Sequence, residues 1–314
     1  MNKAAHGDWA IFRGDGSTHR AVLPEGPPWR RFDPERADPQ RYVIGADEVD
    51  IVNTALHLRR PLLVTGRPGS GKTTLAHAIA DELQLGPVLR WPINSRSTLE
   101  SALYRYDAVA RLHDSAIADI ADKERRSAPD VGRYVRLGPL GTALAPCARA
   151  RVLLIDELDK SDLDLPNDLL TVFEEGTFEI PELARLTDRD TVSVGVSGSD
   201  ERVPVVAGRV RCTQFPVIVV TSNGERDFPP AFLRRCVRLD LPDPGPDRLA
   251  EIVAARLGPD AVAEDLIERF VALRHEGELA TDQLLNAVHL RLAGVVLDED
   301  RLALLFRSLD PTRP

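Results

Sequence analysis

The stretch GRPGSGKT, residues 66–73, decides the fold class of this chain. It matches the pattern G-x-x-x-x-G-K-[ST] and lies between the apolar run 62–64 and a helical pattern over residues 73–83. Glycines let the backbone wrap closely around phosphate oxygens, and the start of the following helix points its positive dipole end the same way. The alternative is a glycine-rich turn that carries a lysine by chance. A strand and a helix in register with the loop favour a phosphate-binding loop in an α/β fold.

The residues of this loop have expected roles toward ATP and Mg²⁺, which are the predicted cofactors. Lys72 is expected to reach the β- and γ-phosphates, and the Thr73 hydroxyl is expected to be a magnesium ligand. The predicted nucleotide-binding residues are Gly66, Arg67, Pro68, Gly69, Ser70, Gly71, Lys72, Thr73 and Thr74.

Two carboxylates, Asp156 and Glu157, directly follow the apolar run 152–155. A buried parallel strand would place both at its carboxyl end, where α/β folds bind ligands. Asp156 is then expected to hold the magnesium ion, directly or through water, and Glu157 to accept a proton from the attacking water. The alternative is an acidic pair that caps the next helix, which is a common role for Asp. The phosphate loop upstream favours the hydrolytic role.

The order of the elements predicts two domains. The runs 62–64, 152–155 and 217–220 are apolar on both faces, which is typical of the centre of a mostly parallel sheet. Beyond the proline-rich segment 242–246 only helical periodicity remains. We expect an irregular arm over 1–42, an α/β domain over 43–241, a small all-helical lid over 246–308 and a tail over 309–314. The lid helices are predicted at 247–257, 261–274, 281–296 and 299–307.

Two stretches exceed what a minimal α/β sandwich needs. Residues 108–133 are charged and broken by Pro129 and Gly132. In 191–211 valines alternate with polar residues on both sides of a Gly-Ser-Asp turn, which predicts a hairpin. Phe178 and Ile180 would suit a pore lining, but an alternating strand packed on the sheet is the favoured interpretation.

The bulk composition narrows the partners and the compartment. The 314 residues include 40 Lys plus Arg and 49 Asp plus Glu, so the net charge of −9 disfavours nucleic acid as the default partner. The three cysteines are odd in number and widely spaced, which argues against a disulfide framework and against a zinc site. The sequence has no apolar run of membrane-span or signal-peptide length. We therefore expect a soluble protein of the cytoplasm, without a membrane partner.

With the phosphate loop and the acidic pair, residues 43–293 resemble the MoxR-like branch of the AAA+ ATPases. The segment TSNGERDFPPAFLRRC, residues 221–236, is similar to the sensor-one strand and the arginine-finger helix of that family. The resemblance implies that Asn223 orients the water, and that Arg235, with Arg234 beside it, reaches the nucleotide of a neighbouring subunit. The alternative for the two arginines is a solvated helix end favoured by the helix dipole.

The resemblance also assigns the two extra stretches and one apolar residue. Residues 108–133 and 191–211 match the helix-two insert and the pre-sensor-one hairpin of the family. Ile44 matches the segment that packs on adenine, although core packing explains an apolar residue there equally well. Residues 280–285 have no arginine where many relatives carry a second sensor, so that role is assigned to no residue.

Four segments indicate a narrower resemblance, to MoxR-like ATPases associated with von Willebrand A domain proteins in bacterial conflict systems. They are LRWPIN (89–94), YRYD (104–107), RLGPLGTAL (136–144) and LPNDLL (165–170). The resemblance implies a homo-oligomeric ring, typically a hexamer, that remodels a protein partner with a von Willebrand A domain. Two alternatives stay open. One is a nucleotide-gated scaffold or switch in a defence or signalling complex, and the other, less favoured, is a nucleic-acid motor.

Overall fold

The fold is taken from a computed structural model that describes residues 11–12, 18, 20, 22–30, 42–121, 130–186, 191–276 and 279–307, with only the backbone for 117–121 and 275–276. The chain forms two compact units. One contains residues 44–67 and 71–241, and the other contains residues 1–43, 68–70 and 242–314. The chain thus passes from the α/β unit to the helical unit between Leu241 and Pro242, at the start of the proline-rich segment.

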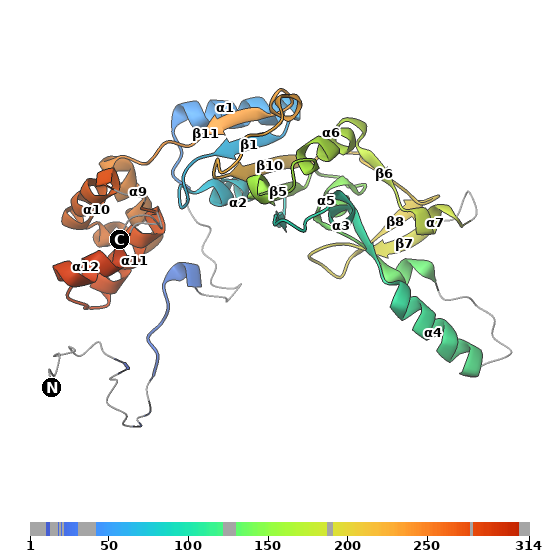
Figure 1. Cartoon of the computed structure of the whole chain (residues 1–314), viewed down its shortest axis with the longest axis horizontal. Coiled ribbons are helices and arrows are strands. Elements are labelled where there is room, and N and C mark those ends of the chain that lie inside the picture. The colour runs from blue at the N-terminus through green and yellow to red at the C-terminus, as the bar shows by residue number, and fades with distance from the viewer. Residues whose placement is uncertain are drawn as a thin grey trace. The chain divides into compact units, whose positions relative to one another are not determined.

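A five-stranded parallel sheet, sheet A, organises the α/β unit. Its strand order is β11-β1-β10-β5-β2 (Figure 1). The three central strands are the three apolar runs, and their buried side chains lie on both faces, as the sequence predicts. The edge strands β2 and β11 are not among the predicted strands. The strands span Leu62–Thr65 (β1), Leu89–Pro92 (β2), Val152–Asp156 (β5), Val217–Ser222 (β10) and Val237–Asp240 (β11).

Helices cover sheet A and fix its loops. Helix α2 packs on β5 and β10, and α1 packs on β11. The apolar spacing of α2 explains its packing, because Leu75, Ala76 and Ile79 form one buried face. The helices of the unit are α1 (Ala46–Leu58), α2 (Lys72–Glu82), α3 (Leu99–Leu103), α4 (Ala108–Ala121), α5 (Pro139–Leu144), α6 (Leu165–Glu175), α7 (Pro181–Ala184) and α8 (Pro230–Leu233), with the 3-10 turns η3 (Val131–Tyr134) and η4 (Leu158–Lys160).

A second, six-stranded sheet, sheet B, was not expected from the sequence as a separate sheet. Its order is β3-β4-β7-β8-β9-β6. The predicted hairpin is its centre, because β7 pairs antiparallel with β8 across the Gly198 turn. Phe178 and Ile180 are buried in the core shared by the two sheets, as a packed strand requires. The strands span Tyr104–Tyr106 (β3), Val135–Leu137 (β4), Thr177–Glu179 (β6), Thr191–Gly195 (β7), Arg202–Val206 (β8) and Arg209–Arg211 (β9).

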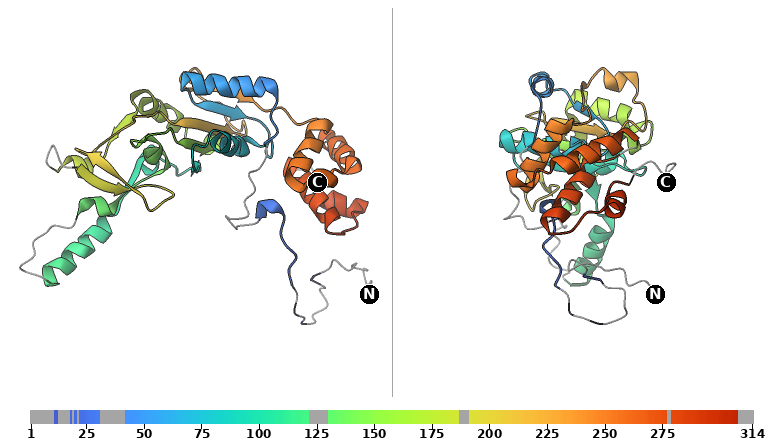
Figure 2. Two further views of the ribbon diagram at one scale, coloured as in Figure 1. Left: turned by 180° about the vertical axis from the view of Figure 1, so that it is seen from behind. Right: turned by 90° about the vertical axis from the view of Figure 1, so that its left-hand side faces the viewer.

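The predicted insert at 108–133 contains helix α4 and the short turn η3. Figures 1 and 2 show α4 extending away from sheet B. Its side chains Val109 and Leu112 are exposed at 78% and 72%, so this face of the helix is apolar and uncovered in the single chain. Residues 122–129 of the insert lie outside the described residues.

The helical unit contains α9 (Pro246–Leu257), η5 (Pro259–Ala261), α10 (Glu264–Glu276), α11 (Thr281–Leu292) and α12 (Glu299–Leu305). Its core includes Phe270 and Phe306, whose ring centroids are 5.5 Å apart. From the amino-terminal arm, η1 (Pro28–Arg30) brings Trp29 against the same core, in edge contact with His289. The sequence also suggests Trp9 and Phe32 as anchors of the arm, and both lie outside the described residues.

Two predicted helix boundaries in this unit differ from the structure by three residues or more. The third lid helix ends at Leu292 rather than at 296, because Gly294 adopts a φ of 83° and ends the helix in the left-handed region. The second begins at Glu264 rather than at 261, because Pro259 starts the separate turn η5. No helix in the described part of the chain is long and apolar enough to cross a membrane. All three cysteines are free thiols.

Candidate functional site

The phosphate loop connects β1 to α2, as the motif requires. Gly69 and Gly71 have φ angles of 76° and 90°, in the left-handed region that glycine reaches without strain. Gly71 immediately precedes the helix, so its backbone turns the loop into the first turn of α2. The free N–H groups of that turn are the feature that binds anions at helix starts.

Lys72 closes the loop on itself. Its Nζ donates to the carbonyl oxygens of Gly66 and Arg67, at 2.7 and 2.8 Å, and the residue is only 7% exposed. Burial lowers the pKa of Lys72, while the nearby carboxylates of Asp159, Glu157 and Asp156 oppose that shift. The cation is thus held at the loop among three acidic side chains, where an anionic ligand would gain from it.

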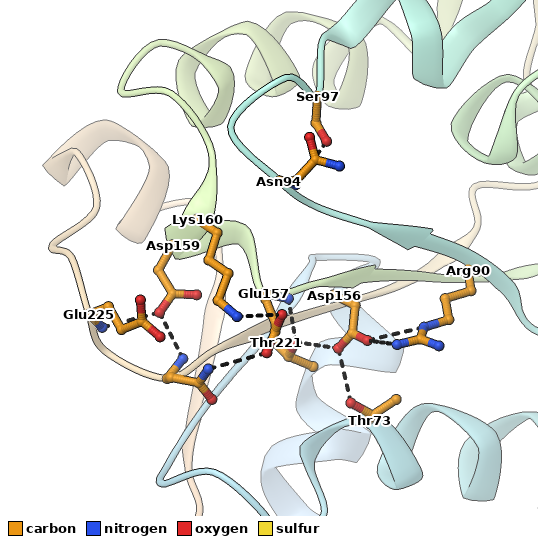
Figure 3. A network of polar contacts seen from close by, with 11 residues as sticks. Thr73, Arg90, Asn94, Ser97, Asp156, Glu157, Asp159, Lys160, Thr221 and Glu225 are labelled. Carbon is orange, nitrogen blue, oxygen red and sulfur yellow. Dashed lines mark hydrogen bonds and ion pairs between the residues drawn. The ribbon is translucent and has the colours of Figure 1, made fainter. Parts of the chain in front are cut away.

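Asp156, at the end of β5, is the hub of a polar network (Figure 3). Its Oδ1 accepts hydrogen bonds from the hydroxyls of Thr73 and Thr221, at 2.9 and 2.8 Å. Its Oδ2 accepts from Nε and Nη2 of Arg90, at 3.1 and 2.6 Å. Burial by itself would raise the pKa of Asp156, but the hydrogen bonds from Arg90, Thr221 and Thr73 outweigh it and lower that pKa below its usual value. Asp156 is therefore held ionised.

Glu157 adopts a backbone conformation that is uncommon for a residue with a side chain. Its φ is 62° and its ψ is 50°, and its N–H donates to the Thr221 hydroxyl at 2.8 Å. Such conformations cost roughly 1–3 kcal/mol and cluster at functional sites. The Glu157 carboxylate accepts from Lys160 Nζ at 2.8 Å and from Asn223 Nδ2 at 3.4 Å. The ion pair with Glu157 raises the pKa of Lys160.

Asp159 connects the loop after β5 to the loop after β10. Its Oδ2 accepts from the backbone N–H groups of Asn223 and Glu225, at 2.9 and 3.1 Å, and the residue is 3% exposed. This contact fixes the backbone of Asn223, whose amide side chain lies beside Glu157. The structure therefore brings together Lys72, Thr73, Asp156, Glu157 and Asn223, as the sequence predicts for one site.

Arg234 and Arg235 follow α8, and both are exposed. Arg235 donates through Nε to the carboxylate of Glu174, in the last turn of α6. Among the described residues, no hydrogen bond or ion pair joins either arginine to the phosphate loop or to the β5 carboxylates of the same chain. Within one chain these arginines are therefore not part of the site.

Two further predicted nucleotide contacts are Ile44 and Thr74. Ile44 is half-buried immediately before α1, and Thr74 is half-buried in the first turn of α2. Contact of either side chain with a nucleotide stays a prediction.

The donor set suits phosphate and Mg²⁺. The Thr73 hydroxyl and the Asp156 carboxylate are hard oxygen ligands that lie 2.9 Å apart, and Mg²⁺ is usually bound by one or two carboxylates plus phosphate oxygens and waters. In the described part of the chain no group of three His, Cys, Asp or Glu residues could hold a metal by itself. The buried Ser70 hydroxyl on the loop lacks a hydrogen-bond partner among the described residues, which leaves it available to a polar ligand.

Four residues of the network were not predicted from the sequence. They are Arg90, Asp159, Lys160 and Thr221. Thr221 and Arg90 come from β10 and β2, the two strands that flank β5 in sheet A. Thr221 and Arg90 could be predicted only from the strand order, since side chains of adjacent parallel strands meet at the carboxyl edge of the sheet.

Comparisons with known proteins agree with this arrangement. The family model described as "AAA domain (dynein-related subfamily)" matches residues 61–236. A solved structure of a RuvB variant from Thermotoga maritima is 17% identical, with 83% of this chain and 68% of that chain covered and a TM-score of 0.41. At this TM-score the likeness adds no weight to the family match. The comparison with curated proteins gave no match.

Proposed function

The chain belongs to the dynein-related subfamily of AAA domains, and from this premise we propose that it binds ATP with Mg²⁺ and hydrolyses ATP to ADP and phosphate. One observation carries the proposal. The phosphate-loop hydroxyl of Thr73 lies 2.9 Å from Asp156, and the next residue, Glu157, is held beside Asn223. A metal-binding pair and a candidate base thus stand together at the end of a central strand.

The proposed roles follow from the chemistry of each side chain. Lys72 and the loop N–H groups would bind the phosphates, and Thr73 and Asp156 would hold Mg²⁺, which when bound would supply positive charge beside the transferred phosphoryl group. Glu157 accepts the proton of the attacking water, and Asn223 orients that water. The hydrogen bond network around Asp156 keeps its carboxylate ionised for this role.

We further propose that the protein works as a ring of identical subunits. Arg235, with Arg234 beside it, is exposed and joins no group of its own chain's site, which suits a residue that completes the site of a neighbour. Its hydrogen bond to Glu174 would have to open for that contact. The resemblance to MoxR-like ATPases supports a protein with a von Willebrand A domain as the remodelled partner, and the cysteine pattern supports the cytoplasm as the compartment.

A nucleotide-gated switch is the second candidate function. The observation in its favour is that Lys160 pairs with Glu157 at 2.8 Å, so the candidate base is engaged by a cation of its own chain. Slow ATP turnover that no protein partner accelerates would favour the switch over the motor. The net charge of −9 keeps a nucleic-acid motor the least favoured reading.

Two variants test the hydrolytic assignment. Lys72→Ala removes the cation aimed at the phosphates, so we expect the binding of a fluorescent ATP analogue to be lost. Glu157→Gln keeps the loop and the metal ligands, so we expect binding near that of the parent and a loss of turnover of about two orders of magnitude or more. Unchanged ATP affinity in Lys72→Ala, or parent turnover in Glu157→Gln, would refute the roles given to these residues.

A further inference from the structure

Every acceptor position of the Asp156 carboxylate is used within the chain. A carboxylate offers about four lone-pair positions. Thr73 and Thr221 take two at Oδ1, and the guanidinium of Arg90 takes two at Oδ2. Asp156 therefore has no position left for the shell of a metal ion until one of these donors leaves or shifts.

Arg90 is the donor with the freedom to leave. Its side chain is 58% exposed, whereas that of Asp156 is 6% exposed. Thr221, in contrast, is fully buried on β10 and also accepts from the N–H of Glu157. Thr73 is itself a proposed ligand of the ion, so its contact with Asp156 is compatible with metal binding.

The register of the sheet explains how Arg90 reaches this place. Arg90 pairs with Leu154, and Pro92 pairs with Asp156, in the parallel ladder of β2 and β5. Alternate residues of a strand share a face, so Arg90 and Pro92 lie on the same face of the sheet. Because Pro92 is the register partner of Asp156, Arg90 lies on the same face as Asp156, two residues before Pro92. The long side chain then spans this diagonal. The ion pair is therefore built by two adjacent strands of sheet A, the edge strand β2 and its neighbour β5, and not by a surface loop.

We propose that Arg90 is a resident counter-ion of Asp156, which Mg²⁺ displaces when the nucleotide-bound metal enters the site. Arg90 is the cation that contacts the buried Asp156 carboxylate directly, since Lys160 is bound to Glu157 and Lys72 donates to carbonyl oxygens of the phosphate loop. Arg90 is thus a positioning residue, and its ion pair with Asp156 sets the concentration of Mg²⁺ at which the metal site fills. This inference rests on the proposed function, because it assumes that Asp156 serves the metal.

The inference predicts that removal of the Arg90 charge tightens metal binding. We would measure the binding of Mn²⁺, as a paramagnetic substitute for Mg²⁺, to the full chain in the presence of saturating ADP, by following the loss of the free Mn²⁺ signal. In Arg90→Met the Kd for Mn²⁺ should fall about three- to tenfold, because no ion pair has to break. Arg90→Lys keeps the charge but donates one bond at a time, and its Kd should lie between those of Arg90→Met and the parent. Arg105→Ala, an exposed arginine of sheet B, is the matched control and should bind Mn²⁺ like the parent.

The outcomes separate this inference from the proposed function. If the parent binds no Mn²⁺ with ADP, both fail. If the parent binds Mn²⁺ but the Kd is unchanged or raised in Arg90→Met and Arg90→Lys, only the role of Arg90 fails. Should Arg90→Met not fold, as judged by its circular dichroism, Arg90→Gln removes the charge but keeps a polar donor on a shorter side chain, and the same tightening is expected for it. An equal Kd in that variant overturns the role.

Discussion

Thr221 holds both proposed hydrolytic residues through one buried hydroxyl. It donates to Asp156 Oδ1 at 2.8 Å and accepts from the N–H of Glu157 at 2.8 Å. The second bond fixes Glu157 in its left-handed conformation, which places the carboxylate beside Asn223. One threonine on β10 therefore sets the geometry of the neighbouring strand's end.

Replacement of Thr221 by valine should damage stability and turnover together. The change leaves the N–H of Glu157 without its partner at a partly buried position, which costs up to about 1–3 kcal/mol. Because Glu157 is then free to leave its position, ATP turnover should fall on the order of tenfold to a hundredfold. Urea unfolding and steady-state ATPase assays check the two effects. Thr191→Val, at an exposed position of β7, is the control, and equal behaviour of the two variants would show that Thr221 has no special role.

Among the individual residues of the candidate site, the sequence predicts those that belong to one continuous motif. Lys72 and Thr73 follow from the loop pattern, and Asp156 and Glu157 follow from an apolar run that ends in acids. Arg90 could not be found in this way. It reaches Asp156 only because β2 pairs with β5, and a single sequence does not contain that pairing.

The sequence predicts the helices and strands that have a long apolar run or a clear apolar repeat. It does not predict the short strands that are recognisable only by their pairing with a neighbouring strand. Strands β1, β5 and β10 are continuous apolar runs, which only a buried parallel strand requires. Sheet B consists of short strands, of which β3, β4, β6 and β9 have three residues each. Three residues carry too little alternation to indicate a strand, so only the longer hairpin β7–β8 was found. Predicted helix ends were wrong where a glycine or a proline ended a helix or delayed its start, as Gly294 does after α11.

An ion pair between helices α10 and α11 gives a pH-dependent test within the helical unit. Both terminal nitrogens of Arg291 donate to the carboxylate of Asp265, at 2.6 and 2.7 Å. The hydrogen bonds from Arg291 lower the pKa of Asp265. The pair is exposed, so its contribution to stability is about 1 kcal/mol or less.

Because the folded-state pKa of Asp265 is depressed, its contribution is present above the unfolded pKa of about 3.9 and is lost as the pH falls through the folded value. We expect Asp265→Asn to reduce the amide hydrogen-exchange protection of α10 and α11 by up to about fivefold at pH 6. The difference from the parent should shrink once the pH falls below about 4. A difference that grows toward acid pH would contradict this assignment.

For the whole molecule, the two units have separate cores, and the central question is whether one chain contains a complete active site. The phosphate loop, the proposed metal ligands and the candidate base all belong to one chain, but among the described residues Arg234 and Arg235 join none of them there. Composition and charge could not predict this, because which side of a chain faces a neighbour is a property of the assembly. The ring therefore remains our proposal.

Subunit mixing tests the central claim, ATP hydrolysis at sites that two subunits complete. An Arg235→Ala subunit keeps its own pocket but offers no finger to its neighbour, while a Lys72→Ala subunit offers a finger but has no working pocket. Each variant alone should be nearly inactive. In an equal mixture, half of the subunits have an intact pocket and half of their neighbours have an intact finger, so about a quarter of the interfaces are complete.

The measurement is steady-state ATPase activity of each variant and of the equal mixture, after subunit exchange and at concentrations where light scattering shows assembly. The account predicts that the mixture recovers up to about a quarter of the parent activity while each variant alone stays near background. No recovery in rings shown to contain both variants, or full activity of Arg235→Ala alone, would contradict it.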